Sequence, residues 1–252
     1  MPMLHLCGKH YTMTTSRINL WSSPRNISTA MMYSFAQRPD SIVFDEPLYA
    51  HYLRVTGIVH PANDEILATQ DNYAENVVRD IVLADHEKPV AFFKQMTHHL
   101  VDVNEDFLFD TSNIIFIREP KQIIRSYSEI RPEVTMQDVG IAKQVYLFNK
   151  LTEGGHAPVV LDSNEILTDP AKVLSQLCEA LGIPFYESML SWPAGPRPED
   201  GVWAPHWYSN VHKTTGFAKQ ASSDKPLPEY LHPLYEESKQ YYNTLYTHSI
   251  KA

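Results

Sequence analysis

The sequence predicts an α/β domain of three layers, in which helices cover both faces of a central, mostly parallel sheet. Short apolar runs typical of strands alternate with segments of helical spacing along most of the chain, an order that favours a parallel sheet. The run at residues 113–117 is almost wholly apolar, as expected of a strand buried on both faces. At 252 residues the chain has the length of one such domain.

The first half of the chain gives three predicted strands and three helices. Apolar content and alternation indicate strands at 17–21, 41–44 and 89–94. Apolar residues three and four positions apart predict one helix from residue 27, one after the second strand, and one over 75–84. Glycine, proline, asparagine and aspartate gather over 57–72, so a loop is expected there.

The second half gives two more strands, at 113–117 and 158–161. Pro120 suits the first turn of a helix, which is expected to follow it. Further helices are predicted over 136–151 and 169–181, the latter ended by Gly182. Prolines in the last quarter indicate a loop-rich segment at about 190–225, followed by a solvated helix over 229–245.

Composition limits the class of protein. The formal net charge of −9 argues against nucleic acid as a partner, and no apolar run is long enough to span a membrane. Residues 1–15 lack the features of a signal peptide, so we expect a flexible tail, with Met13 as an alternative start, before one domain over 16–252. Cys7 and Cys178 make neither a disulfide framework nor a zinc site, as expected of a cytoplasmic protein without a metal. A homodimer is left open.

The stretch at 17–36 predicts an anion site. A strand turns sharply into a helix there, which aims the free N–H groups of the helix start at one point. The hydroxyls of Ser28 and Thr29 lie at that start, and Arg25 adds a fork of donors suited to phosphate or sulfate. The loop lacks the glycines and lysine of a nucleotide triphosphatase. An ordinary buried strand and helix with a polar cap is the structural alternative.

Three segments in order resemble the sulfotransferase family, whose donor is 3′-phosphoadenosine 5′-phosphosulfate (PAPS). Residues 23–29 look like the family's 5′-phosphosulfate loop. Residues 117–127 are similar to its 3′-phosphate segment, with Arg118 at a strand end and Ser126 in the next helix. Residues 161–185 resemble a strand-to-helix stretch found widely in the family. Taken alone, Arg118 would be read as a surface ion pair with Glu119 or Asp110, and Ser126 as part of a solvated helix face.

The resemblance implies a fold related to nucleotide kinases and transfer of a sulfuryl group from PAPS to a small-molecule hydroxyl or amine, which leaves the bisphosphate PAP. Arg25 stands where the family usually has a lysine and would stabilise the leaving oxygen; Ile27 stands where it has a glycine. By this resemblance the residues expected to bind the donor are Pro24, Arg25, Asn26, Ile27, Ser28, Thr29, Arg118, Ser126, Lys213, Thr214, Thr215 and Gly216.

The resemblance also implies a general base and an acceptor side. Family members often use a histidine after the third strand, here His98 or His99, although Lys94 lies further upstream than in the family pattern. A pair of histidines that caps the strand is the plainer alternative. Glu46 and Tyr49 follow the second strand and are expected on the acceptor side. The acidic balance and the aromatic content would suit a cationic acceptor.

Two other functions remain open at this point. One is a kinase for a nucleoside or small molecule, against which the missing glycine–lysine motif speaks. The other is a binding module that holds PAP or PAPS without catalysis.

Overall fold

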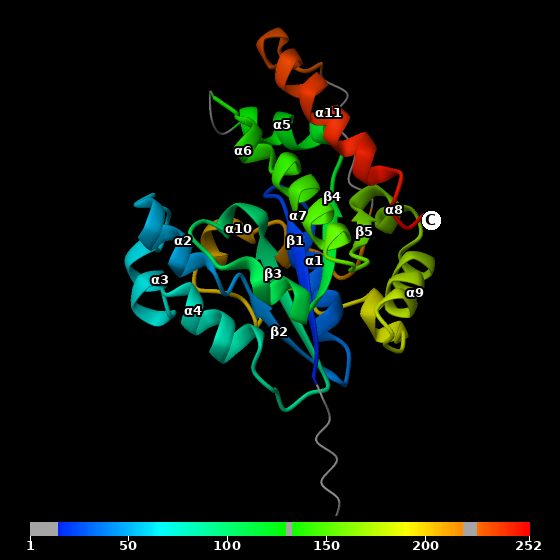
Figure 1. The fold of residues 1–252 in the computed structure, drawn as a ribbon. Coiled ribbons are helices and arrows are strands. Elements are labelled where there is room, and N and C mark those ends of the chain that lie inside the picture. The colour runs from blue at the N-terminus through cyan, green and yellow to red at the C-terminus, as the bar shows by residue number, and fades with distance from the viewer. Residues whose placement is uncertain (1–14, 130–132, 219–225) are drawn as a thin grey trace, which may run out of the picture.

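The computed structural model describes residues 15–129, 133–218 and 226–252. The predicted tail and the alternative start at Met13 lie outside the described residues, except for Thr15. The strands are β1 (Ser16–Ser22), β2 (Ser41–Asp45), β3 (Val90–Met96), β4 (Ser112–Ile117) and β5 (Val159–Asp162). They form one sheet in the order β2-β3-β1-β4-β5, and every neighbouring pair is parallel (Figure 1). The predicted α/β class and the parallel sheet are confirmed.

The helices connect these strands and then cover the last part of the chain. They are α1 (Ser28–Ala36), α2 (Tyr49–Thr56), α3 (Asn63–Thr69), α4 (Ala74–Val77), α5 (Pro120–Ser128), α6 (Met136–Val139), α7 (Ile141–Glu153), α8 (Ser163–Thr168), α9 (Pro170–Ala180), α10 (Ala204–Trp207) and α11 (His232–Tyr246). A π-helical turn, η1 (Val78–Val82), extends α4. Short 3-10 turns are η2 (Thr97–His99), η3 (Glu105–Asp110), η4 (Glu187–Leu190), η5 (Val211–Lys213) and η6 (Glu229–Leu231).

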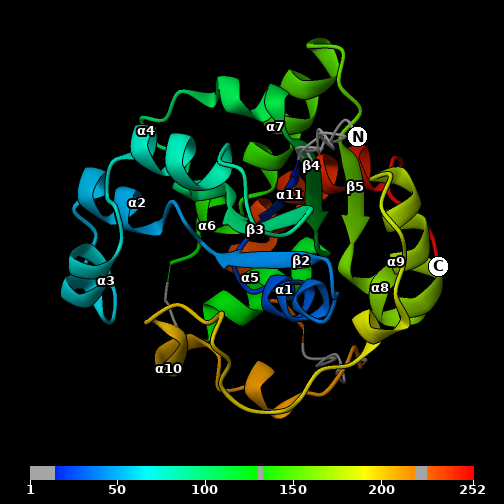
Figure 2. The same ribbon diagram turned by 90° about the horizontal axis from the view of Figure 1, so that it is seen from below.

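The two faces of the sheet bury separate hydrophobic cores, which gives the three layers. Ile18 and Leu20 of β1 pack with α1 and α9 on one face. Trp21 of the same strand belongs to the core on the other face, with residues of α4, α5, α7 and α11. Figure 2 shows α1 and α9 on the opposite side of the sheet from α4 and α7. This alternation follows from the two-residue period of a strand.

Two predicted boundaries differ from the structure. Helix α3 lies inside the predicted loop at 57–72, where Ile66 is fully buried and anchors it. The helix predicted over 136–151 is divided at Gly140, whose φ of 76° ends α6. A Cβ at Gly140 would lie 3.1 Å from that of Ser23, so this glycine lets the chain approach the loop after β1 closely.

The C-terminal helix is also less solvated than predicted. Helix α11 packs against α5 and α7, and Leu245 is fully buried. The tyrosines of this helix combine an apolar ring with a polar end, so they pack while their hydroxyls reach polar partners: Tyr242 donates to Asp162 Oδ2 (3.0 Å). No helix in the described ranges is long and apolar enough to cross a membrane.

The topology places the ends of β1, β3 and β4 side by side. From β1 the chain passes to the edge strand β2, returns to β3 beside β1, and then crosses to β4 on the other side. Ligands of such sheets bind beyond the carboxyl ends of the strands at this change of direction. Gln144 of α7 ties the ends of β1 and β4 together. Its fully buried amide donates to Trp21 O (3.1 Å) and Phe116 O (2.7 Å).

We predict that Gln144→Ala lowers the free energy of unfolding by about 1–3 kcal/mol, because two buried carbonyls lose a donor. Urea denaturation measures this change. Gln240→Ala is the matched control, since Gln240 is exposed on α11 and its side chain has no such role. An equal effect of the two substitutions would contradict the role assigned to Gln144.

Candidate active site

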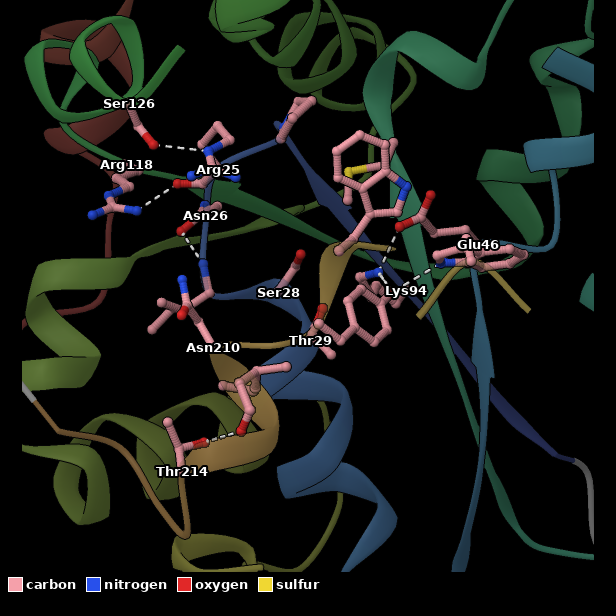
Figure 3. Close-up of a pocket in the computed structure, with 18 of the residues that line it drawn as sticks. Arg25, Asn26, Ser28, Thr29, Glu46, Lys94, Arg118, Ser126, Asn210 and Thr214 are labelled. Atoms are coloured by element: carbon pink, nitrogen blue, oxygen red, sulfur yellow. Dashed lines mark hydrogen bonds and ion pairs between the residues drawn. The ribbon is translucent and has the colours of Figure 1, made fainter. Parts of the chain in front are cut away.

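A cavity of about 390 Å³ opens beyond the carboxyl ends of the strands. Its walls come from the loop after β1 and the start of α1, from the ends of β2 and β3, from η2, from the β4–α5 connection, and from the segment at 203–218. Figure 3 shows Arg25, Arg118 and Ser126 at one side of it, Glu46 and Lys94 at the other, and Ser28 and Thr29 between them. The cavity therefore has two chemically different halves.

The basic half is built from two segments far apart in the sequence. Arg25 Nε donates to Ser126 Oγ over 2.8 Å, and Arg118 Nη1 donates to the backbone oxygen of Arg25. Arg118 Nε donates to Gln122 Oε1 (2.9 Å), which fixes the guanidinium. Arg25 has a φ of 58°, a left-handed conformation that is rare for a residue with a side chain and recurs at functional sites.

Neither guanidinium of the basic half forms an ion pair with a carboxylate in the ranges that the structure describes. Burial lowers the pKa of Arg118 from its ordinary value, and the positive charge of Arg25 lowers it further. Two neighbouring cations without a counter-ion repel one another. The arrangement is therefore stabilised by an anion that both can contact.

The start of α1 completes this half. Ile27 precedes the helix with no side-chain cap, while Asn26 Oδ1 accepts from Ile27 N (2.8 Å). The first N–H groups of α1 thus face the cavity beside the hydroxyls of Ser28 and Thr29, both of which line it. Ile27 has a φ of −89°, an ordinary value for a residue with a side chain. The isoleucine at the family's glycine position therefore does not strain this loop.

The other half is centred on Lys94, whose side chain is 1% exposed. Its ammonium donates to Asp45 Oδ1 (2.8 Å), Glu46 Oε1 (2.6 Å) and Tyr208 OH (2.6 Å). Burial alone would lower the pKa of Lys94, but the two carboxylates outweigh it and hold that pKa well above its ordinary value. One cation thus faces two acidic groups.

Glu46 has a carboxylate oxygen to spare. Its Oε1 bonds to Lys94, whereas Oε2 lies 3.9 Å from His99 Nε2 and accepts no hydrogen bond from a described residue. The side chain is only 9% exposed and lines the cavity. Burial raises the pKa of Glu46; Lys94 opposes this shift and Asp45 adds to it. Glu46 also has a left-handed backbone, with φ at 45°.

Two histidines follow β3 and differ in their surroundings. His98 is half-buried and lines the cavity, and a smaller adjoining pocket also has His98 and Pro24 in its wall. Burial lowers the pKa of His98 to about 4, so its imidazole is neutral at pH 7. His99 is 1% exposed and its ring stacks on Tyr49 and Tyr52. Burial lowers the pKa of His99 well below its ordinary value, and its Nδ1 has no partner.

Aromatic rings form the wall around Glu46. Tyr49 and Trp203 stand nearly perpendicular, with centroids 5.0 Å apart and an interplanar angle of 85°. Trp203 Nε1 donates to Tyr208 OH (3.1 Å), and this hydroxyl donates to Asp45 Oδ2 (2.8 Å), which holds the segment at 203–218 against the buried charges. Trp207 also lines the cavity and is 46% exposed, so it borders the opening to solvent.

The structure brings most of the expected site residues into this one cavity. They are Pro24, Arg25, Asn26, Ile27, Ser28, Thr29, Glu46, Tyr49, His98, His99, Arg118, Ser126, Thr214 and Gly216. Lys213 and Thr215 are exposed and do not line it. The turn η5 points this part outward, while Thr214 is held inward by a bond from Trp192 Nε1 (3.2 Å). Lys213 and Thr215 thus lie outside the cavity wall, and their contact with the donor stays a prediction.

Sequence reasoning did not include several lining residues. Lys94, His60, Trp203, Tyr208 and Asn210 all line the cavity. Lys94 carried a signal, because a lysine inside an otherwise apolar strand must find buried partners. Tyr208 carried none, since it lies far along the chain from Asp45, whose Oδ1 and Oδ2 accept from its hydroxyl at 2.9 and 2.8 Å.

Comparison with known proteins gives curated relatives and a family match. Two Arabidopsis thaliana proteins, branched-chain-amino-acid aminotransferase-like proteins 2 and 1, are each 39% identical over 232 residues, or 92% of this chain. The chain spans about two fifths of the length of these relatives, 41% and 42%. The family model described as a sulfotransferase domain matches residues 16–248.

Solved structures show the same fold at low sequence identity. A sulfotransferase from Alicyclobacillus acidocaldarius has a TM-score of 0.56 at 12% identity, with 94% of this chain and 98% of that one covered. The sulfotransferase domain of the curacin biosynthetic pathway has a TM-score of 0.53 at 16% identity, with 92% and 98% covered. The sulfotransferase domain of the Synechococcus PCC 7002 olefin synthase gives 0.51 at 18%, with 94% and 96% covered. The family model matches nearly the whole chain. The chain therefore belongs to the sulfotransferase domain family, a family of transferase enzymes.

Proposed function

We propose that the chain transfers the sulfuryl group of PAPS to a hydroxyl or amine of a small-molecule acceptor, leaving PAP. The observation that carries this proposal is the pair of guanidinium groups of Arg25 and Arg118, which line one cavity without a carboxylate partner among the described residues. A donor with negative charge at both ends of one nucleotide supplies the counter-ions that this pair lacks.

The residues present fit such a donor. Arg118 and Ser126 would hold its 3′-phosphate, since the charged fork just before α5 and the hydroxyl from the last turn of α5 line the same cavity. The loop at 23–27, the first N–H groups of α1, and Ser28 and Thr29 would hold the 5′-phosphosulfate. Thr214 and Gly216 line the same cavity and would cover the nucleotide.

The bound donor supplies the activated sulfuryl group, and the acceptor oxygen or nitrogen forms the new bond to sulfur as the bond to the bridging phosphate oxygen breaks. The electron pair of that broken bond stays with the phosphate. Arg25 stabilises the charge that develops on this leaving oxygen. The cavity holds donor and acceptor in line, because the basic half and the half around Glu46 face one another across Ser28 and Thr29.

His98 is the general base of this proposal. It lies next to the loop after β1 and is neutral at pH 7, so it can take the proton that the acceptor loses. His99 lies between two tyrosine rings and serves to pack η2 against α2. Glu46 and Tyr49 lie on the acceptor side.

We further propose one cytoplasmic domain over 16–252, with the segment at 190–225 as its cover, acting on small molecules without nucleic acid or a metal. No group of three potential metal ligands occurs in the described residues, and the acidic balance agrees with a small anionic donor bound only by local cations. A homodimer stays open.

PAP is predicted to raise the melting temperature, whereas ATP with magnesium leaves it unchanged. At 100 times its dissociation constant PAP adds about 2.7 kcal/mol, or roughly 5–10 °C for a chain of this size. Differential scanning fluorimetry measures the shift. Arg25→Ala and Arg118→Ala remove it, while Arg79→Ala, a change of an exposed arginine outside the cavity, keeps it. A shift with ATP and magnesium but none with PAP would instead support the kinase.

His98→Ala is predicted to lower turnover about 10²–10⁴-fold and to leave the PAP-induced shift intact, because only proton transfer is lost. His99→Phe retains an aromatic ring between the tyrosines and keeps most of the turnover. The readout is the rate at which sulfate-labelled PAPS gives labelled products with a metabolite extract, identified by mass spectrometry. His156→Ala, at an exposed histidine outside the cavity, is the control.

Full turnover in the His98→Ala, His99→Phe double variant would show that the base lies elsewhere. No labelled product from the wild type, together with PAP binding, would favour a binding module without catalysis.

A further inference from the structure

The half of the cavity around Lys94 carries an unbalanced negative charge. Lys94 contributes +1 and the carboxylates of Asp45 and Glu46 contribute −1 each, so the ionised cluster sums to −1. Both carboxylate oxygens of Asp45 already accept hydrogen bonds. Each accepts from Tyr208, and Oδ2 also accepts from Gly201 N (3.0 Å). The surplus charge therefore lies on Glu46.

Glu46 presents that charge to the cavity. Its Oε2 accepts no hydrogen bond from a described residue, although more than nine tenths of the side chain is buried. His99 Nε2 lies 3.9 Å from this oxygen, and His99 stays neutral because burial lowers its pKa well below the ordinary value. Glu46 lines the cavity, so a cationic ligand bound there can pair with this oxygen.

Aromatic side chains line the same cavity as Glu46. Tyr49, Trp203 and Trp207 line the same cavity, and the rings of Tyr49 and Trp203 stand nearly perpendicular. Aromatic faces attract organic cations, and more strongly when water is excluded. A neutral acceptor would gain the packing but would not match the charge on Glu46.

We propose that the acceptor is a small hydroxylated organic cation, such as an amino alcohol or a quaternary ammonium alcohol, whose positive end lies between Glu46 and these aromatic rings. This inference rests on the proposed function. The cation is anchored on one side while its hydroxyl is directed toward His98 and the basic half. The oxygen forms a bond to sulfur, the donor's bridging S–O bond breaks, and the hydroxyl proton passes to His98. The product is a zwitterion, with a sulfate ester and an unchanged cationic group.

Binding of charge-matched pairs tests the proposal without any turnover. We would titrate the full chain, with and without PAP, with choline against 3,3-dimethylbutan-1-ol, ethanolamine against propan-1-ol, and tyramine against 4-propylphenol. Each pair differs chiefly in charge, so calorimetry reports the charge preference directly. We expect at least one cation to bind about tenfold or more tightly than its neutral partner.

Variants locate this preference on the proposed residues. Glu46→Gln keeps the shape and an oxygen for Lys94, and it should reduce the cation preference from about tenfold to about onefold. Glu153→Gln, at an exposed glutamate of α7, should leave the preference unchanged. Trp207→Leu should lower the preference and Trp207→Phe retain it, which gives a second test if the Glu46 variant is unstable. A PAP-induced melting shift reports that each variant is folded.

Equal or weaker binding of every cation would overturn the acceptor proposal, as would a preference that survives Glu46→Gln. A PAP-induced shift in the same samples shows whether the donor proposal stands when the acceptor proposal fails. Absence of that shift, together with a clear cation preference, would refute the donor assignment and leave the cation site.

The affinity for the cation is predicted to fall as the pH is lowered through the raised pKa of Glu46. Below that pKa, where most Glu46 is protonated, binding of the cation releases a proton. Burial keeps this pKa above its ordinary value, with Lys94 opposing and Asp45 reinforcing. His99 and Tyr208 also face the cluster, but His99 stays neutral and the pKa of Tyr208 is raised well above its ordinary value. Calorimetry in buffers of different ionisation enthalpy measures the released proton. A cation affinity independent of pH down to acid unfolding would contradict the role of Glu46.

Discussion

Two guanidinium groups, held together without a carboxylate partner among the described residues, are the constraint on which the rest of this site depends. Arg118 donates to the backbone of Arg25, and Arg25 donates to Ser126 next to it in the fold. These contacts join the loop after β1 to the β4–α5 connection and to the last turn of α5, so these segments are positioned as one unit. Because the guanidiniums repel each other, their closeness is stabilised when an anion lies between them.

The sheet makes this closeness obligatory. β1 pairs with β4 in parallel, with Ser22 opposite Phe116, so their following loops leave the same edge. Gln144 and Asn26 both donate to Phe116 O, at 2.7 and 3.1 Å, which ties the loop after β1 and helix α7 to β4. The basic half of the cavity is thus a consequence of strand order and of a few buried amides.

The opposite half has the reverse charge for a different reason. Lys94 lies within β3 and cannot reach water, so the fold surrounds it with Asp45, Glu46 and Tyr208. Two carboxylates face one ammonium group, so one negative charge is left over, and it lies at the wall of the cavity. A cavity that is positive at one end and negative at the other favours two ligands of opposite charge, which agrees with an anionic donor and a cationic acceptor.

Local patterns allowed much of the fold to be predicted from the sequence. Alternating and apolar runs identified all five strands, and the turn from strand to helix at 17–36 indicated the anion site. Residues whose role depends on distant partners were not accessible in this way. Tyr208 meets Asp45 across 163 positions, and α3 depends on the burial of Ile66 rather than on its loop-like composition.

The late segment shows the same limit. A basic residue near Gly216 indicated a donor contact, yet Lys213 is exposed and Thr214 is the residue held against the cavity. Which histidine is better placed as a base also depends on tertiary contacts. His98 and His99 are equivalent in sequence, but stacking between two tyrosines buries only His99 completely.

A crystal structure of the complex with PAP is the most direct test of this account. We predict one PAP molecule in the cavity, with its 3′-phosphate within hydrogen-bonding distance of Arg118 and Ser126, and its 5′-phosphate at the first N–H groups of α1. A nucleotide bound elsewhere, or Arg25 and Arg118 turned away from each other toward separate carboxylates, would contradict it.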